Sequence, residues 1–72
     1  MTKRIKRGDV VRFQENQSRW VIHSVYHAGT IVHMTLENGG GAARAIPTKS
    51  LIKLEEATSE TIEFVNFPVQ CL

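Results

Sequence analysis

The sequence predicts a single all-β domain, a small five-stranded barrel followed by an extended C-terminal tail. Short runs rich in β-branched and aromatic residues recur between turn residues over positions 10–54. The segment 38–41, Asn-Gly-Gly-Gly, is the strongest break in the chain, because Asn and Gly tolerate the positive φ of hairpin turns. A chain of 72 residues makes one domain with a thin core.

The first two strands are predicted at 10–13 and 19–27. The first reads Val-Val-Arg-Phe and follows a turn at Gly8 and Asp9. The polar stretch 14–18 is predicted to be a loop. The second strand is rich in Trp, Val, Ile and Tyr, which are residues that favour strands.

Three further strands are predicted at 31–37, 42–46 and 51–54. A tight turn at 27–30 precedes the third strand, and the Gly-rich segment precedes the fourth. Residues 47–50 begin with Pro and are expected to form one helical turn before the last strand.

The pairing of the second and third strands can be argued from burial. If their loop comprises residues 28–30, Tyr26 pairs with Val32 and Ile22 with Leu36. Apolar side chains then gather on one face, as burial of one face of a sheet requires. A two-residue loop would mix the two faces. The predicted core is Val10, Phe13, Trp20, Ile22, Tyr26, Val32, Met34, Leu36, Ile46, Leu51 and Leu54.

The opposite face of this hairpin is expected to be an interface. In this register it carries the apolar side chains of Val21, Val25 and Ile31 among polar ones. Either the C-terminal tail, with Phe64 and Phe67, covers this face or a partner does. A short helix from Ser59 is the alternative for the tail. Its β-branched residues and Pro68 favour an extended segment.

Charge is distributed unevenly along the chain. Residues 1–20 carry six Lys or Arg and two acidic residues, whereas residues 55–72 carry four Glu and no Lys or Arg. The predicted organisation is a basic arm at 1–7, the barrel at 8–55 and an acidic, apolar segment at 56–72 that packs on the barrel or on a partner. The basic arm suits a polyanion such as nucleic acid, although an acidic tail that folds back would weaken that contact.

The residues expected to contact nucleic acid are Lys3, Arg4, Lys6, Arg7, Arg12, Arg19 and Arg44. Lys49 and Lys53 would extend this basic stripe. Each phosphate neutralised by such a side chain releases counterions, so binding would weaken as salt rises. The alternative is a solubilising terminus on a slightly basic domain. Base stacking is not expected, because Trp20 and Tyr26 are assigned to the core face.

No catalytic residue, cofactor or metal site is predicted. Ser24 and His23 point to opposite faces of their strand, so they cannot act together as a nucleophile and base. His23, His27 and His33 share one face in the predicted register. The candidates for a fourth ligand are Glu37 and the distant Cys71, and solvated strand histidines are far commoner than zinc ligands.

A cytoplasmic location is expected. Cys71 is the only cysteine, which fits a reducing compartment. No apolar run approaches the roughly 20 residues that span a bilayer. The basic N-terminus lacks the hydrophobic stretch of a signal peptide. Neither a membrane nor a small-molecule substrate is expected as a partner.

Two resemblances bear on the fold. The stretch 6–12, Lys-Arg-Gly-Asp-Val-Val-Arg, resembles the opening of KOW-type and other SH3-like barrels, which implies an SH3-like barrel that binds RNA, ribosomes or RNA polymerase factors. Residues 8–54 are similar in pattern to the type II dihydrofolate reductases, which are also SH3-like barrels and build their site by assembling into a ring. That family has Val-Gln-Ile-Tyr before a Pro where this chain has Ala43-Arg44-Ala45-Ile46, so the resemblance implies the barrel and argues against that activity.

Two functions remain open from the sequence. The favoured one is a non-catalytic regulatory module, of the size of bacterial and phage accessory proteins, that contacts nucleic acid or a nucleic-acid complex through its basic residues. The alternative is a protein-interaction or self-associating module that uses the face of Val21, Val25 and Ile31 together with the apolar tail.

Overall fold

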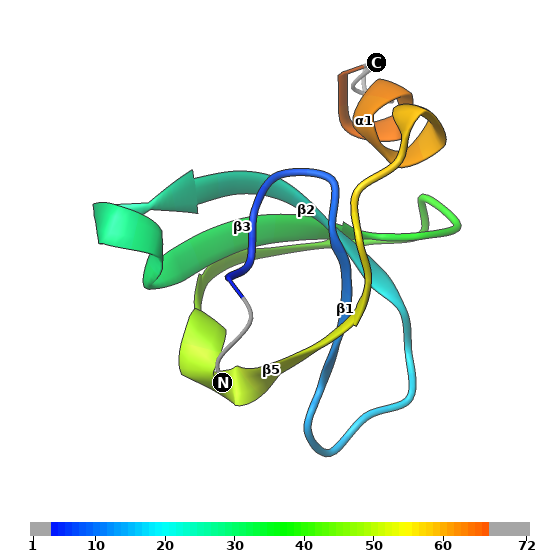
Figure 1. Ribbon diagram of the computed structural model, residues 1–72. Coiled ribbons are helices and arrows are strands. Elements are labelled where there is room, and N and C mark those ends of the chain that lie inside the picture. The colour runs from blue at the N-terminus through cyan, green and yellow to red at the C-terminus, as the bar shows by residue number, and fades with distance from the viewer. Residues whose placement is uncertain (1–3, 67–72) are drawn as a thin grey trace.

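The computed structural model describes residues 4–66 and shows one antiparallel five-stranded sheet with a short C-terminal helix (Figure 1). The strands are β1 (Val10–Phe13), β2 (Trp20–Tyr26), β3 (Ile31–Leu36), β4 (Ala42–Pro47) and β5 (Leu51–Glu55). Their order across the sheet is β4-β3-β2-β1-β5. The predicted all-β class with five strands is confirmed. The edge strands β4 and β5 do not pair with each other in the described chain, so the sheet is open.

Three helical segments complete the described structure. Two single 3₁₀ turns, η1 (His27–Gly29) and η2 (Thr48–Ser50), connect β2 to β3 and β4 to β5. The predicted helical turn after Pro47 is therefore present. The α-helix α1 (Ser59–Asn66) follows β5. Within residues 4–66, no helix has the length and apolar character needed to cross a membrane.

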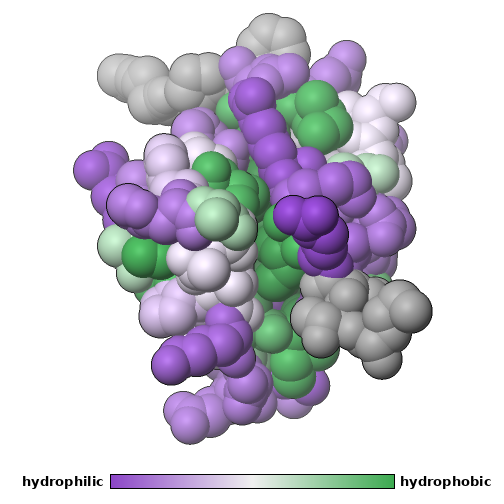
Figure 2. Space-filling model, turned by 60° about the vertical axis from the view of Figure 1, so that its left-hand side comes forward, coloured by the Kyte–Doolittle hydropathy of each residue, from purple (hydrophilic) through white to green (hydrophobic). Residues whose placement is uncertain are grey.

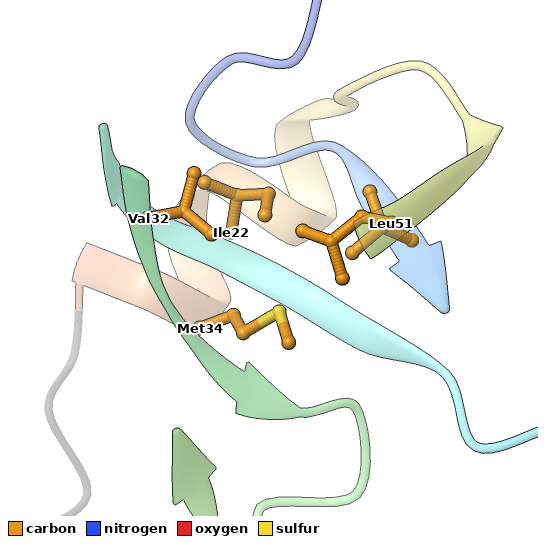
Figure 3. Packing of buried hydrophobic residues seen from close by; sticks show 5 residues of the cluster. Ile22, Val32, Met34 and Leu51 are labelled. Atoms are coloured by element: carbon orange, nitrogen blue, oxygen red, sulfur yellow. The ribbon is translucent and has the colours of Figure 1, made fainter. Parts of the chain in front are cut away.

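The sheet has a hydrophobic cluster on each face, because successive strand residues point to opposite sides. The main cluster consists of Val11, Ile22, Val32, Met34 and Leu51. In Figure 3 the side chains of Ile22, Val32 and Leu51 extend into the same space above β2. The second cluster joins Val10 and Val21 to Val65 of α1, with Phe64 packed against it. The helix therefore covers the outer face of β1 and β2.

The predicted pairing of β2 with β3 is wrong in register, since Ile22 pairs with Met34 instead of Leu36 and Tyr26 pairs with Ile31 instead of Val32, and it lacked a bulge. Ile22 pairs with Met34, but Ser24 pairs with His33, so β2 has one extra residue at His23. The connection to β3 comprises residues 27–30, which were expected to form a tight turn, and is one residue longer than the loop 28–30 on which the predicted pairing was based. A bulge of this kind turns every later side chain of the strand to the other face.

This bulge explains an exchange in the core. Val25 packs against the main cluster, whereas Tyr26, predicted to be buried, is 41% exposed. Leu54 is also exposed rather than buried, at 38%. The other predicted core residues are buried or half-buried. The prediction omitted Val11, Val21 and Val65, which are buried in the structure.

The extended tail is also corrected, since residues 59–66 form α1. Thr58 caps the helix: its hydroxyl accepts a hydrogen bond from the Thr61 backbone N–H at 3.2 Å, and the Thr61 hydroxyl accepts one from the Thr58 N–H at 2.8 Å. This reciprocal arrangement satisfies amides that a helix start leaves free. The negative charge of Glu60 in the first turn interacts favourably with the positive end of the helix dipole and stabilises the helix. Pro68, which favoured an extended tail, lies outside the described residues.

Candidate functional site

An open groove runs between the N-terminal segment 4–7, the bulged part of β2, η1 and the start of β5. Its cationic lining residues are Arg4, Lys6, Arg7, Lys49 and Lys53, and the lining includes no Asp or Glu. The side chains of Ile5, Val25, Leu51 and Ile52 supply an apolar part. Figure 2 brings this side of the molecule forward and shows a band of hydrophobic side chains flanked by hydrophilic ones. The groove thus combines an apolar floor with a basic rim.

The N-terminal wall of the groove is fixed by the turn that precedes β1. The Gly8 N–H donates to the Ile22 carbonyl and the Ile22 N–H donates to the Asp9 carbonyl, both at 2.9 Å. Gly8 has φ +91, a conformation that a residue with a Cβ rarely adopts. The space where a Cβ would lie is filled by Ile62 of α1 and by Ala57. The helix, the turn and β2 therefore hold one another in place.

Asp9 is the centre of this wall, with a side chain that is fully buried. Its carboxylate accepts hydrogen bonds from the Lys6 backbone N–H at 2.8 Å and from the Ala57 N–H at 2.9 Å. The Lys53 ammonium lies 3.1 Å from the same carboxylate and is itself only 8% exposed. A buried carboxylate requires such partners, since an unpaired buried charge is costly.

Lys53 and Lys6 share a second carboxylate, Glu56. The Lys53 Nζ lies 2.8 Å from Glu56, and Lys6 also pairs with Glu56. These hydrogen bonds lower the pKa of Glu56 to about 2 and raise the pKa of each lysine above its ordinary value. Lys53 further donates to the Arg4 carbonyl at 3.1 Å. Two of the five groove cations are therefore compensated, and they hold in place the N-terminal segment that carries Arg4 and Arg7.

The uncompensated charge of the groove lies on Arg4, Arg7 and Lys49. None of the three forms an ion pair with a carboxylate in the part of the chain that the structure describes. Arg7 donates to the side-chain oxygen of Asn66 on α1, which is a neutral partner. All three side chains are exposed. They are therefore available to an anion.

Arg12 and Arg44, which were also expected to contact nucleic acid, do not line the groove. The Arg12 guanidinium donates to the carbonyls of Phe13 and Gln14, at 3.0 and 3.3 Å. Arg44 is exposed on the edge strand β4. Lys3 falls outside the described residues. The groove thus brings together Arg4, Lys6 and Arg7 from the expected set and adds Lys49 and Lys53 from the expected extension.

Arg19 forms ion pairs with Glu37, which follows β3, and with Glu55, the last residue of β5. Its guanidinium contacts Glu37 at 2.8 Å and Glu55 at 2.9 Å. The hydrogen bond with Glu37 is the main cause that raises the pKa of Arg19, and it lowers the pKa of Glu37. Because two carboxylates compensate this charge, Arg19 adds little positive potential to the surface.

The face expected to be an interface is partly covered by the chain itself. Val21 is buried beneath α1, in the cluster against which Phe64 packs. Val25 faces the main core because of the bulge, and Ile31 is half-buried. Phe67 lies outside the described residues. Whether a partner protein binds this face stays a prediction.

The three histidines are not gathered on one surface as predicted. His23 is at the bulge, where its Nδ1 lies 2.6 Å from the Ser24 hydroxyl, and both residues line the groove. The prediction that these two side chains point to opposite faces and cannot meet is therefore wrong, because the bulge interrupts the alternation of the strand. His27 begins η1 with φ 53. His33 packs against Tyr26, with ring centroids 4.7 Å apart. Within residues 4–66, no group of three or more His, Cys, Asp or Glu side chains is placed to hold a metal ion.

Two features of the structure were not predicted from the sequence. The apolar floor was not predicted. Ile5 lies in the predicted basic arm, and Ile52 lies in a strand of which only Leu51 and Leu54 were assigned to the core. The exposure of Tyr26 was not predicted, because it depends on the bulge at His23. An extra residue in one strand has no reliable sequence signal.

No protein-family model, curated protein or solved structure matches this chain. What the groove binds is therefore inferred from its own residues.

Proposed function

We propose that this protein is a non-catalytic, cytoplasmic binding module that contacts the phosphate backbone of a nucleic acid through the basic groove. The observation that carries the proposal is the lining of the groove, which has five Lys or Arg side chains and no carboxylate. Lys and Arg are the residues that neutralise phosphates and release their counterions.

The arrangement of charge supports a backbone contact. Arg4 and Arg7 lie in the N-terminal segment and Lys49 lies in η2, so two segments distant in sequence bring uncompensated cations to one groove. Lys6 and Lys53 form ion pairs with Asp9 and Glu56, and these pairs hold the N-terminal wall of the groove in place while an anion binds. Cations held by a rigid framework lose less conformational entropy on binding than free ones do.

The topology supports the likeness to SH3-like barrels. Strand β1 pairs with both β2 and β5, and a single 3₁₀ turn joins β4 to β5, an arrangement compatible with a small barrel-like fold. The basic Gly8-Asp9 turn resembles that of KOW-type members, many of which bind RNA or its machinery. The stretch Ala43–Ile46 lacks the Gln and Tyr of the type II reductases, which favours binding over that catalysis.

The proposal is tested with a groove variant and a matched control. The double variant Arg4→Gln/Lys49→Gln removes two uncompensated cations whose side chains make no ion pair within residues 4–66. The control is Arg44→Gln, which removes an exposed cation from β4, outside the groove. Binding is followed by fluorescence anisotropy of labelled mixed-sequence oligonucleotides, single-stranded and duplex, from low to moderate salt.

We expect the double variant to bind several-fold more weakly at low salt. The slope of log K against log salt should fall by about 1.5, since each phosphate contact contributes about 0.7 to 0.9. The control should bind as the unaltered protein does. Absence of binding at low salt, or an equal loss in both variants, would overturn the proposal.

A further inference from the structure

The bulge in β2 brings two polar side chains together in the groove. His23 and Ser24 are adjacent in the chain, yet the His23 Nδ1 lies 2.6 Å from the Ser24 hydroxyl. In a regular strand the two side chains would point to opposite faces, and the extra residue in β2 removes that alternation. Both residues line the groove, and the His23 side chain is exposed. The bulge therefore adds an imidazole and a hydroxyl to a surface of Lys and Arg side chains.

This pair lies beside the N-terminal wall of the groove. The pairing of Val10 with Val21 continues beyond β1, where the Gly8 N–H donates to the Ile22 carbonyl at 2.9 Å. Arg7 precedes Gly8 and His23 follows Ile22, so the antiparallel pairing brings Arg7 and the His23–Ser24 pair to the same part of the groove.

His23 is the histidine that lines the groove, whereas His27 and His33 do not. Histidine is the side chain whose ordinary titration changes its charge between pH 5 and 8. Asp9 and Glu56, which pair with Lys6 and Lys53, do not line the groove. The charged side chains that line it with His23 are Arg4, Lys6 and Arg7 of the N-terminal segment, Lys49 of η2 and Lys53 of β5. Within residues 4–66, His23 is therefore the groove residue whose charge responds to pH near neutrality.

The hydrogen bond between His23 and Ser24 determines what the pair offers to an anion. A neutral imidazole and a hydroxyl carry one proton each, and one of these protons lies between Nδ1 and the hydroxyl oxygen. The other proton is free to be donated outward, in either tautomer. When the imidazole is protonated, Nδ1 donates to Ser24, so that both Nε2 and the hydroxyl donate outward. Protonation therefore adds a donor and a positive charge at the same place.

We propose that His23 and Ser24 form a phosphate-binding subsite of the groove, and that protonation of His23 strengthens the binding of the nucleic acid. This inference rests on the proposed function of the groove. A phosphate beside the imidazole favours its charged form, so phosphate binding and proton uptake by His23 strengthen each other. Hydrogen bonds from a charged donor to a phosphate are also stronger than those from a neutral donor.

The experiment measures affinity and its salt dependence at about pH 8 and about pH 5.5, on either side of the ordinary titration of histidine. The proteins are the unaltered chain, His23→Gln and the matched control His33→Gln, which replaces a histidine outside the groove. Amide NMR spectra establish that the variants are folded. The labelled oligonucleotides carry no terminal phosphomonoester, since that group would itself titrate in this range. Binding is followed by anisotropy.

The unaltered protein should bind several-fold more tightly at the lower pH. Its slope of log K against log salt should be steeper there by about 0.7 to 0.9, because protonated His23 neutralises one further phosphate. His23→Gln should lose both changes with pH, and His33→Gln should keep them. The NMR signal of the His23 ring should show that the imidazole retains its proton to higher pH in the complex than in the free protein.

A variant of the second residue tests the hydroxyl separately. Ser24→Ala should weaken binding at both pH values and keep the steeper slope at the lower pH, because it removes a neutral donor and leaves the charge of His23. Unchanged affinity in Ser24→Ala would remove the hydroxyl from the subsite.

The outcomes separate this inference from the function of the groove. If Arg4→Gln/Lys49→Gln loses affinity but the unaltered protein binds equally at both pH values, the subsite is wrong and the groove function stands. A dependence on pH that persists in His23→Gln, or that disappears in His33→Gln, also contradicts the subsite. If no oligonucleotide binds the unaltered protein at either pH, both proposals fail.

Discussion

Asp9 shows how one residue can organise a small domain. Its buried carboxylate joins the N-terminal wall of the groove, strand β5 and the linker to α1, through Lys6, Lys53 and Ala57. A main core of five buried side chains leaves little hydrophobic stabilisation in reserve. Each of these polar contacts therefore has a large share in the free energy of unfolding.

We expect Asp9→Asn to destabilise the protein strongly. The amide has the same shape, but it leaves the largely buried Lys53 ammonium without one of its two carboxylates. Removing one partner of a buried ion pair costs about 3–5 kcal/mol, which is a large part of the stability of a domain this small. Urea unfolding followed by tryptophan fluorescence measures the change. Glu15→Gln, in the exposed loop between β1 and β2, is the control and should change the stability by less than about 0.5 kcal/mol. Equal stabilities for the two variants would contradict the central role of Asp9.

The sequence predicted part of this arrangement. Gly8 and Asp9 were expected to form the turn before the first strand, because Gly accepts unusual φ and Asp favours turns. The burial of Asp9 could not be inferred, since its partners Lys53 and Ala57 lie far along the chain. The basic residues of the arm were also recognisable as candidate contacts. Which of them stay uncompensated depends on where Glu55, Glu56 and Glu37 fall in the folded chain.

At the scale of elements, the docking of α1 determines which apolar surface is exposed. The helix places Ile62 against Gly8 and Val65 against Val10 and Val21. Sequence reasoning anticipated that the tail or a partner would cover Val21, but it assigned the tail an extended shape. Its β-branched residues favour strands only weakly, and the reciprocal cap of Thr58 and Thr61 together with burial of one helix face outweighs that preference.

The edge strand β5 illustrates a second effect of this packing. Ile52 and Leu54 are exposed on it, whereas Lys53 between them points inward to Asp9. An exposed apolar edge invites pairing with another chain, and an inward-pointing charge on such a strand opposes that pairing. The placement of Lys53 thus fixes the wall of the groove and reduces the tendency of β5 to add a foreign strand.

The contact between α1 and the turn is tested with two glycine substitutions that differ in their surroundings. Gly8 and Gly29 have nearly the same φ, +91 and +88, so a methyl group brings similar backbone strain at both. At Gly8 the new Cβ would lie 2.5 Å from Ile62 Cδ1, whereas at Gly29 nothing lies within 4 Å. Gly8→Ala should therefore be less stable than Gly29→Ala by about 1–3 kcal/mol, the usual cost of overpacking. Thermal and urea unfolding of both variants measure the difference. Equal losses would mean that α1 does not pack on this turn.

For the molecule as a whole, the uneven distribution of charge along the chain leads to ion pairs between its basic first part and its acidic last part. The sequence analysis considered an acidic tail that folds back, and the structure pairs Lys6 of the basic arm with Glu56. Arg19, also in the basic first part of the chain, pairs with Glu55. The all-β class and the five strands followed from residue patterns and turn chemistry. The bulge, the helix and the open groove did not, because each depends on packing between segments that are distant in sequence.

Because of these contacts between the two ends of the chain, the stability of the whole fold depends on pH. Hydrogen bonds from Lys53 and Lys6 lower the pKa of Glu56 from 4.5 to about 2. Because the pKa is lower in the folded state, the stabilisation is fully present above pH 4.5 and is lost as pH falls toward 2. Glu37, whose pKa Arg19 also lowers, acts in the same direction.

We expect Glu56→Gln to be less stable than the unaltered protein at pH 7, with a difference that shrinks as pH falls from about 4.5 to 2. The two stability curves should converge near pH 2, because protonated Glu56 no longer attracts the lysines and then resembles Gln. Urea unfolding at a series of pH values measures both curves, and Glu37 contributes equally to each. Repeating the series at about 1 M salt should reduce the difference at pH 7, since Glu56 is exposed and the Debye length falls to about 3 Å. Curves that stay parallel down to pH 2 would show that the contacts of Glu56 with Lys6 and Lys53 contribute nothing to holding the two ends of the chain together.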